Sequence, residues 1–155
     1  MLFRSNIVKK FGLDSKKHAS TPMSSSTKLN VDSSGVEVSP TLYRSIIGSL
    51  LYLTASRPDI AFSIGVCARY QANPKESRLT AVKRIIRYVN ETSNYGLWYS
   101  KDSNVCLTGY SDADCAGSVD DRKSTSGGCF YLGNNLVSWM SKKQKIGRAS
   151  CRERV

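Results

Sequence analysis

A change in the spacing of apolar residues near residue 96 constrains the fold of this 155-residue chain more than any other feature. Before that point, apolar residues recur every three or four positions, which is the spacing of one helix face. After it, short runs rich in aromatic and β-branched residues alternate with turn residues, as is typical of strands. The sequence therefore predicts an α+β fold, with a three-helix segment followed by an antiparallel meander.

Two of the helices are expected between residues 39 and 68. Ser39 can cap the first helix and Pro40 suits its first turn. The residues of its apolar face are Leu42, Ile46, Ile47, Leu50 and Leu53. The second helix begins around residues 56–59, where Asp59 suits the positive end of the helix dipole. Its apolar face is formed by Ile60, Ile64 and Cys67.

The third expected helix has the strongest start signal in the chain. Asn73 can cap it, Pro74 fits the first helical position, and Glu76 stands three residues after the cap, as in a capping box. Its apolar stripe comprises Leu79, Val82, Ile85, Ile86 and Val89. Four basic residues occupy other positions, namely Arg78, Lys83, Arg84 and Arg87. They either contact nucleic-acid phosphates or form a solvated face, and the sequence favours the two interpretations equally.

Residues 14–39 are expected to form an exposed, flexible linker. They are rich in Ser, Thr, Lys and Asp, contain Pro22 and Gly35, and show no periodicity. Ahead of them, Ile7, Val8 and Phe11 predict a short helix that stops at Gly12.

Four short strands are expected beyond Gly96, at residues 97–100, 105–111, 129–132 and 136–140. Gly133-Asn134-Asn135 suits a hairpin connection between the last two. The aromatic residues Trp98, Tyr99 and Tyr110 could stack on bases, but aromatic side chains on strands more often belong to a sheet core.

The charge of the chain favours a polyanionic partner such as nucleic acid. The formal net charge is +11. Almost half of the excess lies in residues 142–155, which carry six basic residues and one acid, a net of +5. No apolar run approaches the ~20 residues that span a bilayer, and the N-terminus lacks the pattern of a secretory signal. We therefore expect an intracellular chain with no membrane partner.

Five cysteines, an odd number without a C-x-x-C pair, argue against a disulfide framework or a zinc site.

Several motifs resemble Copia-type LTR-retrotransposon Pol polyproteins. In the first half these are Tyr-Arg-Ser-Ile-Ile-Gly-Ser-Leu-Leu-Tyr-Leu at 43–53, Ser-Arg-Pro-Asp-Ile at 56–60, and residues 79–88. In the second half they are Gly-Tyr-Ser-Asp-Ala-Asp at 109–114, Asp-Arg-Lys-Ser-Thr-Ser-Gly at 121–127, and Ser-Trp-Met-Ser-Lys-Lys-Gln at 138–144. The match covers roughly residues 7–144 in the order of the family.

The resemblance implies a division of the chain. It assigns residues 1–13 to the end of a preceding reverse-transcriptase segment and residues 40–92 to the helical C-terminal connection segment of that enzyme. Residues 96–144 resemble the N-terminal part of a ribonuclease H domain, so the sheet is expected to be an incomplete ribonuclease H-like sheet. The basic tail at 145–155 lies outside the family pattern.

The same resemblance implies a polyprotein that copies RNA into DNA and degrades the RNA strand of the hybrid. Its expected partners are an RNA/DNA hybrid and the rest of the Pol polyprotein, in a cytoplasmic virus-like particle or the nucleus. The paired-aspartate signature of the polymerase is absent, because Asp120-Asp121 lies in the ribonuclease H-like half. DNA synthesis by this chain alone is therefore not expected.

Ribonuclease H chemistry resembles two-metal hydrolysis, with two Mg²⁺ ions roughly 4 Å apart held by several carboxylates. Of the four carboxylates of the family, only the first maps here, to Asp112, which is the expected catalytic residue and magnesium ligand of an incomplete site. Asp114 is the weaker alternative. Glu153, in a tail unlike the family, is not expected to be a ligand. Cys115 replaces the usual tryptophan of the family, which would leave an underfilled site if that position were buried.

The chain is therefore expected to be catalytically inactive by itself. Two alternatives remain open. It is an active hybrid nuclease if missing sequence completes it, or a basic nucleic-acid-binding module retained by a host.

Overall fold

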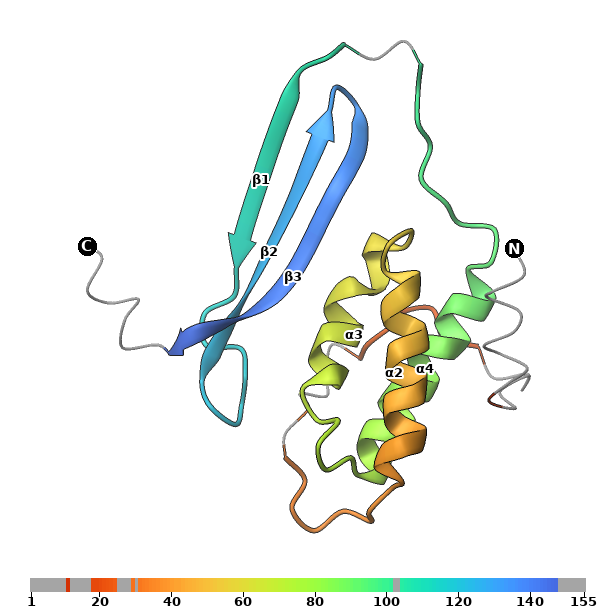
Figure 1. Cartoon of the computed structure of the whole chain (residues 1–155), viewed down its shortest axis with the longest axis vertical. Helices are drawn as coiled ribbons and strands as arrows, with labels where there is room; N and C mark the ends of the chain where they lie inside the picture. The colour runs from red at the N-terminus through yellow and green to blue at the C-terminus, as the bar shows by residue number, and fades with distance from the viewer. Residues whose placement is uncertain (1–10, 12–17, 25–28, 30, 102–103, 148–155) are drawn as a thin grey trace. The chain divides into compact units, whose positions relative to one another are not determined.

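The computed structural model describes residues 11, 18–24, 29, 31–101 and 104–147. They form two compact units that divide between Tyr95 and Gly96, a helical unit and a sheet unit (Figure 1). The predicted α+β class is confirmed, with three helices in the first unit and an open, three-stranded antiparallel sheet in the second. None of the helices described is long and apolar enough to cross a membrane.

Helix α2, Pro40–Leu53, begins where the sequence predicts. Ser39 accepts a hydrogen bond from the backbone N–H of Leu42 (3.4 Å), and Pro40 occupies the first turn. One member of the expected apolar face, Leu42, is 44% exposed. Tyr43 is buried in its place, and its hydroxyl donates to the carbonyl of Cys67 (2.9 Å). The hydrogen bond explains why a tyrosine can be fully buried here.

The second predicted helix consists of two pieces. A single 3₁₀ turn, η1 at Pro58–Ile60, leads into α3 at Ala61–Ala68. The expected apolar face is confirmed, since Ile60, Ile64 and Cys67 are all buried.

Helix α4, Glu76–Glu91, begins two residues later than the capping box predicts. Lys75 is the cap residue and makes no side-chain capping bond. The backbone N–H of Glu76 instead donates to the carbonyl of Val36 (2.9 Å), and Glu37 forms an isolated antiparallel bridge with Lys75. The prediction of a cap at Asn73 is wrong because a neighbouring backbone segment already satisfies the start of the helix.

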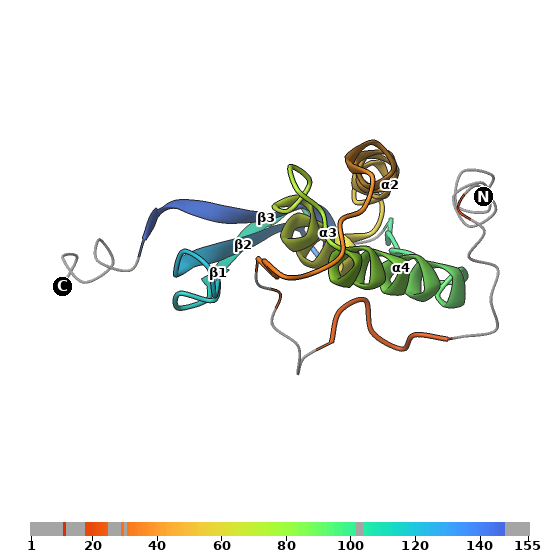
Figure 2. The same ribbon diagram turned by 90° about the horizontal axis from the view of Figure 1, so that it is seen from below.

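The three helices enclose the core of the helical unit, and each contacts the other two (Figure 2). Its largest fully buried side chains come from all of them and include Tyr43, Ile47, Leu50, Ile60, Ile64, Val82, Ile85, Ile86 and Val89.

The expectation of an exposed linker at residues 14–39 is wrong for several residues that the structure describes. Ala19 is only 8% exposed and belongs to the core cluster. The carbonyl of Thr21 accepts from Arg84 (3.0 Å), and that of Leu29 accepts from the Tyr70 hydroxyl (3.2 Å). The helix predicted at Ile7 and Val8 lies outside the described residues.

The sheet unit contains β1, Leu107–Ala113, β2, Lys123–Leu132, and β3, Asn135–Gly147, in the order β1-β2-β3. The hairpin predicted between the last two strands is confirmed, and Gly133 has the positive φ (60°) that such a turn requires. Both β2 and β3 extend well beyond the predicted runs.

The strand predicted at residues 97–100 is wrong. The backbone N–H of Ser100 donates to Oδ1 of Asn135 (2.8 Å), and the side-chain amide of Asn135 donates back to the carbonyl of Ser100 (3.0 Å). A side chain therefore takes the place of a partner strand. Trp98 is 87% exposed, so its expected place in the sheet core is also wrong.

Both faces of the sheet carry apolar side chains. The register places Tyr110, Cys129, Tyr131 and Trp139 on one face and Leu107, Phe130, Leu132 and Met140 on the other. Five of these side chains are exposed, namely Leu107, Tyr110, Phe130, Leu132 and Met140. The sheet thus remains open at both edges and uncovered within the sheet unit.

Candidate functional site

Asp112 lies on β1, directly before the last residue of the strand, and is exposed. It is paired across the sheet with Gly127 of β2, and its Oδ1 accepts a hydrogen bond from the backbone N–H of Ala113 (2.7 Å). Because β1 is an edge strand of this sheet, the backbone at Asp112 pairs with a neighbouring strand on one side only.

Asp114, the alternative ligand, is committed to the connection that follows β1. Its Oδ1 accepts from the backbone N–H of Thr125 (2.5 Å), and its own N–H donates to the carbonyl of Thr125 (3.1 Å). Gly117 approaches the same carboxylate so closely that an added Cβ would lie 1.9 Å from Oδ2. Asp114 therefore shapes the turn, and Asp112 is the acid of this pair that is better placed for a ligand.

The Asp120-Asp121 pair lies in the same connection. Asp121 forms an ion pair with Lys143 of β3 (2.5 Å), and the hydrogen bond from Lys143, followed by that from Ser118, lowers the pKa of Asp121 to about 2. This acid pairs with a lysine within the sheet unit and is not turned toward Asp112 as a second metal ligand.

The described residues do not fit a two-magnesium site. No group of three or more His, Cys, Asp or Glu side chains among them lies close enough to hold a metal ion. A single carboxylate offers at most two oxygens, and one oxygen of Asp112 already accepts the Ala113 N–H. One acid of this kind cannot fix a pair of ions against a phosphate.

Two of the described cysteines, Cys115 and Cys67, differ in their exposure to solvent. Cys115 is exposed, so the replacement of tryptophan leaves no underfilled buried position. Cys67 is buried, and burial raises the pKa of its thiol to about 12. Because the thiolate is the reactive form, Cys67 is inert at neutral pH.

The four basic residues of α4 do not form one surface. Arg78 is only 3% exposed, and its guanidinium carbon lies 4.5 Å from the ring centroid of Tyr70, a cation–π contact. Its position could have been predicted, because Arg78 precedes the buried Val82 and Ile85 by four and seven residues and therefore lies on the apolar stripe. Arg78 is a packing residue rather than a phosphate contact.

Lys83, Arg84 and Arg87 are half-buried. Arg84 donates from Nε to the carbonyl of Thr21 (3.0 Å) and from Nη2 to its hydroxyl (2.7 Å). The Nε of Arg87 is buried and has no hydrogen-bond acceptor among the described residues. Both arginines line a cavity between α4 and residues 18–24.

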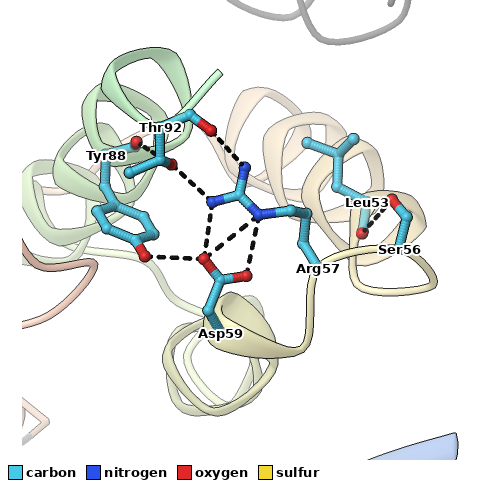
Figure 3. A network of polar contacts seen from close by, with 6 residues as sticks. All are labelled: Leu53, Ser56, Arg57, Asp59, Tyr88 and Thr92. Atoms are coloured by element: carbon cyan, nitrogen blue, oxygen red, sulfur yellow. Dashed lines mark hydrogen bonds and ion pairs between the residues drawn. The ribbon is translucent and has the colours of Figure 1, made fainter. Parts of the chain in front are cut away.

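Sequence reasoning missed a polar network around Arg57 that ties η1 to the end of α4 (Figure 3). The Arg57 side chain forms a forked ion pair with Asp59, with Nε 2.9 Å from Oδ1 and Nη2 2.7 Å from Oδ2. Nη2 also donates to the hydroxyl of Thr92 (2.6 Å), and Nη1 donates to its carbonyl (3.3 Å). The Tyr88 hydroxyl completes the network by donating to Oδ2 of Asp59 (2.8 Å).

The hydrogen bonds of this network favour the charged forms of both Arg57 and Asp59. The hydrogen bond to Asp59 raises the pKa of Arg57, which is 5% exposed. Burial alone would raise the pKa of Asp59, but the hydrogen bonds from Arg57 and Tyr88 outweigh it, and the pKa lies below its usual value. The Ser-Arg-Pro-Asp motif therefore stabilises the helical unit. The ion pair could have been predicted from the sequence, since an arginine and an aspartate two residues apart flank a proline in a turn.

The chain is similar to long polyproteins of plant transposons. It is 42% identical over 145 residues to the Retrovirus-related Pol polyprotein from transposon RE1 of Arabidopsis thaliana, a match of 94% of this chain and 10% of that protein. It is 42% identical over 129 residues to the corresponding protein from transposon RE2 of the same plant, covering 83% of this chain and 9% of that protein. The chain thus spans about a tenth of the length of these relatives.

A third relative is much shorter. Over 112 residues the chain is 42% identical to the Secreted RxLR effector protein 161 of Plasmopara viticola, which covers 72% of this chain and 79% of that protein. No model of a known protein family matches the chain, and no solved structure is significantly similar to it. The identities to the transposon proteins extend over most of both units, and on that ground the chain belongs to the Pol polyproteins of Copia-type retrotransposons.

Proposed function

We propose that this chain is the junction of the reverse transcriptase and ribonuclease H regions of a Pol polyprotein, and that it is catalytically inactive by itself. The helical unit is the connection segment at the end of the reverse transcriptase, and the sheet unit is the start of the ribonuclease H domain. The carboxylate of Asp112 near the end of an edge strand carries this proposal, since the described residues supply no group of three or more acidic, His or Cys side chains that could hold a metal ion there. Magnesium chemistry then requires ligands from further sequence.

The proposed substrate of the complete protein is an RNA/DNA hybrid. Lys83, Arg84 and Arg87 contribute contacts to the phosphate backbone, whereas Arg78 supports the fold. Binding by the isolated chain is weak, independent of sequence, and steeply reduced by salt, because it rests on a few phosphate contacts. The remaining partner is the rest of the polyprotein, within a virus-like particle or the nucleus.

The decisive experiment uses a labelled RNA/DNA hybrid with Mg²⁺. It compares this chain with a version in which the residues after Gln144 are replaced by the remainder of a family ribonuclease H domain. We expect cleavage by the completed protein alone, and its loss on Asp112→Asn. Cleavage by the short chain that disappears on Asp112→Asn would overturn the proposal.

The short relative from Plasmopara viticola favours a second candidate, a module that stands alone, because a similar stretch makes up 79% of that protein. Nucleic-acid binding by such a module is proposed from the net charge of +11. Salt dependence separates the two. A module that works alone should bind nucleic acid more tightly at physiological salt than the ~10⁻⁴ to 10⁻⁶ M typical of non-specific contacts. Binding that vanishes at that salt concentration supports the Pol junction.

A further inference from the structure

A cavity of about 380 Å³ lies within the helical unit, between residues 18–24 and α4. Figure 2 shows residues 18–24 running alongside α4. The α4 wall is a polar stripe at helical spacing, formed by Ser77, Thr80, Arg84 and Arg87. The volume lies in the lower part of the range of small-molecule pockets, ~300–1,000 Å³.

Among the residues that the structure describes, the two arginines of this stripe have no carboxylate as a counter-charge. Arg84 and Arg87 are three residues apart on one helix, where like charges repel. Arg84 bonds only to the neutral carbonyl and hydroxyl of Thr21, and no carboxylate within the described ranges pairs with either arginine.

Two acids are bonded to other residues that line this cavity. Glu91 pairs with His18, and Asp32 accepts from the hydroxyl of Ser77 (2.6 Å). Among the described residues nothing accepts from the Nε of Arg87, an atom that is itself buried. An anion in the cavity would offset the repulsion between the two guanidinium groups.

We propose that this cavity binds a phosphoryl oxyanion between Arg84 and Arg87. A guanidinium donates two parallel N–H groups, a geometry that matches phosphate oxygens. Two adjacent guanidiniums balance the charge of a phosphate monoester better than that of a single carboxylate. The hydroxyl of Thr80 lies on the same stripe and can add a neutral donor. This proposal rests on the phosphate contacts of Arg84 and Arg87 in the proposed function and goes further by assigning them a defined cavity, and it involves neither Asp112 nor the sheet unit.

The test titrates the full chain with inorganic phosphate at constant ionic strength. Calorimetry and the NMR chemical shifts of α4 monitor the binding. We expect saturable binding that weakens by about tenfold or more in Arg87→Gln. Arg44→Gln removes the same charge from an exposed position on α2, outside the cavity, and should change the affinity less than about twofold.

Arg84 also holds Thr21, so its loss could loosen residues 18–24 rather than remove a ligand contact. Arg87→Lys avoids this difficulty because it keeps the charge and removes the fork, and we expect it to weaken phosphate binding while circular dichroism remains unchanged. Absence of saturable binding, or equal affinity in the wild type and Arg87→Gln, would overturn the proposal.

Two further probes identify the source of the phosphoryl group. A nucleoside monophosphate tests a small ester, and a short DNA strand tests the phosphates of a nucleic-acid backbone. Displacement of inorganic phosphate by either probe, lost in Arg87→Gln, supports the site and assigns its source. Asp112→Asn should leave phosphate binding unchanged, so failure of this proposal and failure of the proposed hybrid nuclease region can be told apart.

Discussion

Arg57 joins two elements that are far apart in the sequence. Its guanidinium donates to Asp59 in η1 and to both the carbonyl and the hydroxyl of Thr92, the residue that ends α4. The face of the guanidinium also approaches the Tyr88 ring, with Cζ 5.7 Å from its centroid. The Arg57 side chain is almost fully buried, so its removal would take a hydrogen-bond donor from Asp59 and from both oxygens of Thr92 at once.

Arg57→Ala should therefore destabilise the helical unit strongly. We expect a loss of about 3 kcal/mol in the free energy of unfolding, since removal of the guanidinium leaves Asp59 without its ion-pair partner, with only the Tyr88 hydroxyl as a side-chain donor among the described residues, and takes the donor from the Thr92 carbonyl. Urea unfolding followed by circular dichroism measures it. Arg44→Ala, at an exposed position where the side chain donates a single hydrogen bond to the Gln71 carbonyl (3.1 Å), is the control and should cost about 1 kcal/mol or less. Equal effects of the two substitutions would contradict a structural role for the network.

The same network predicts a pH dependence. The pKa of Asp59 is lower in the folded state than its ordinary value of about 3.9. The ionised carboxylate therefore stabilises the fold above that ordinary pKa, and this contribution is lost as the pH falls through the lower, folded-state pKa. We expect the unfolding free energy of the wild type to decline below about pH 4 more steeply than that of Asp59→Asn. Parallel pH profiles would show that Asp59 is not coupled to folding.

Residue-scale predictions from the sequence succeeded where a side chain acts through its own helix. The buried face of Ile60, Ile64 and Cys67 follows from spacing alone. The network of Arg57 does not, because it depends on where Thr92 comes to lie, 35 residues along the chain. The same limit applies to Arg87, whose cavity is formed by residues 18–24.

At the scale of elements, the starts of α2 and α4 show two ways of satisfying the first N–H groups of a helix. Ser39 uses its side chain, as the sequence predicts. The start of α4 instead relies on residues 36–38, whose backbone accepts from Glu76 and donates to Pro74 (3.1 Å). A capping box is a local signal, and a tertiary backbone contact replaces it here.

These two starts should respond differently to substitution. Ser39→Ala removes a side-chain cap and is expected to cost about 1 kcal/mol, whereas Asn73→Ala should cost less than about 0.5 kcal/mol. Thermal or urea unfolding of the two variants gives the comparison directly. A larger loss in Asn73→Ala than in Ser39→Ala would restore the capping box as the start of α4.

In the sheet unit, one element could be predicted from local sequence and another could not. Its hairpin could be predicted from Gly133-Asn134-Asn135, because turn chemistry is local. The absence of a strand at residues 97–100 could not be, since it follows from the two hydrogen bonds between Ser100 and the side chain of Asn135. Composition alone does not distinguish a strand from an extended segment held by a side chain.

At the scale of the whole molecule, the change of periodicity near residue 96 coincides with the boundary between the two compact units. The two units differ in how completely they bury their apolar side chains. The helical unit buries a continuous core, whereas the sheet unit exposes large side chains on both faces and leaves β1 and β3 as edges. The pattern is consistent with a chain that spans about a tenth of its polyprotein relatives.

The uncovered sheet predicts self-association of the isolated chain. Unpaired edge strands offer N–H and C=O groups to other chains, and exposed apolar faces add a driving force. Tyr110 lies in the middle of the edge strand β1, is 61% exposed, and its ring meets that of Tyr131 at 5.9 Å. We therefore expect analytical ultracentrifugation of the full chain to show association that increases with concentration.

Tyr110→Lys should reduce this association, because a charge in the middle of an edge strand opposes pairing with another chain. Leu51→Lys is the matched control, since it adds the same charge at an exposed apolar position on α2, in the helical unit and not in the sheet unit. The expected result is a shift toward monomer in Tyr110→Lys and little change in Leu51→Lys. A similar shift in both variants would mean that net charge alone, and not the open edge of the sheet, controls the association.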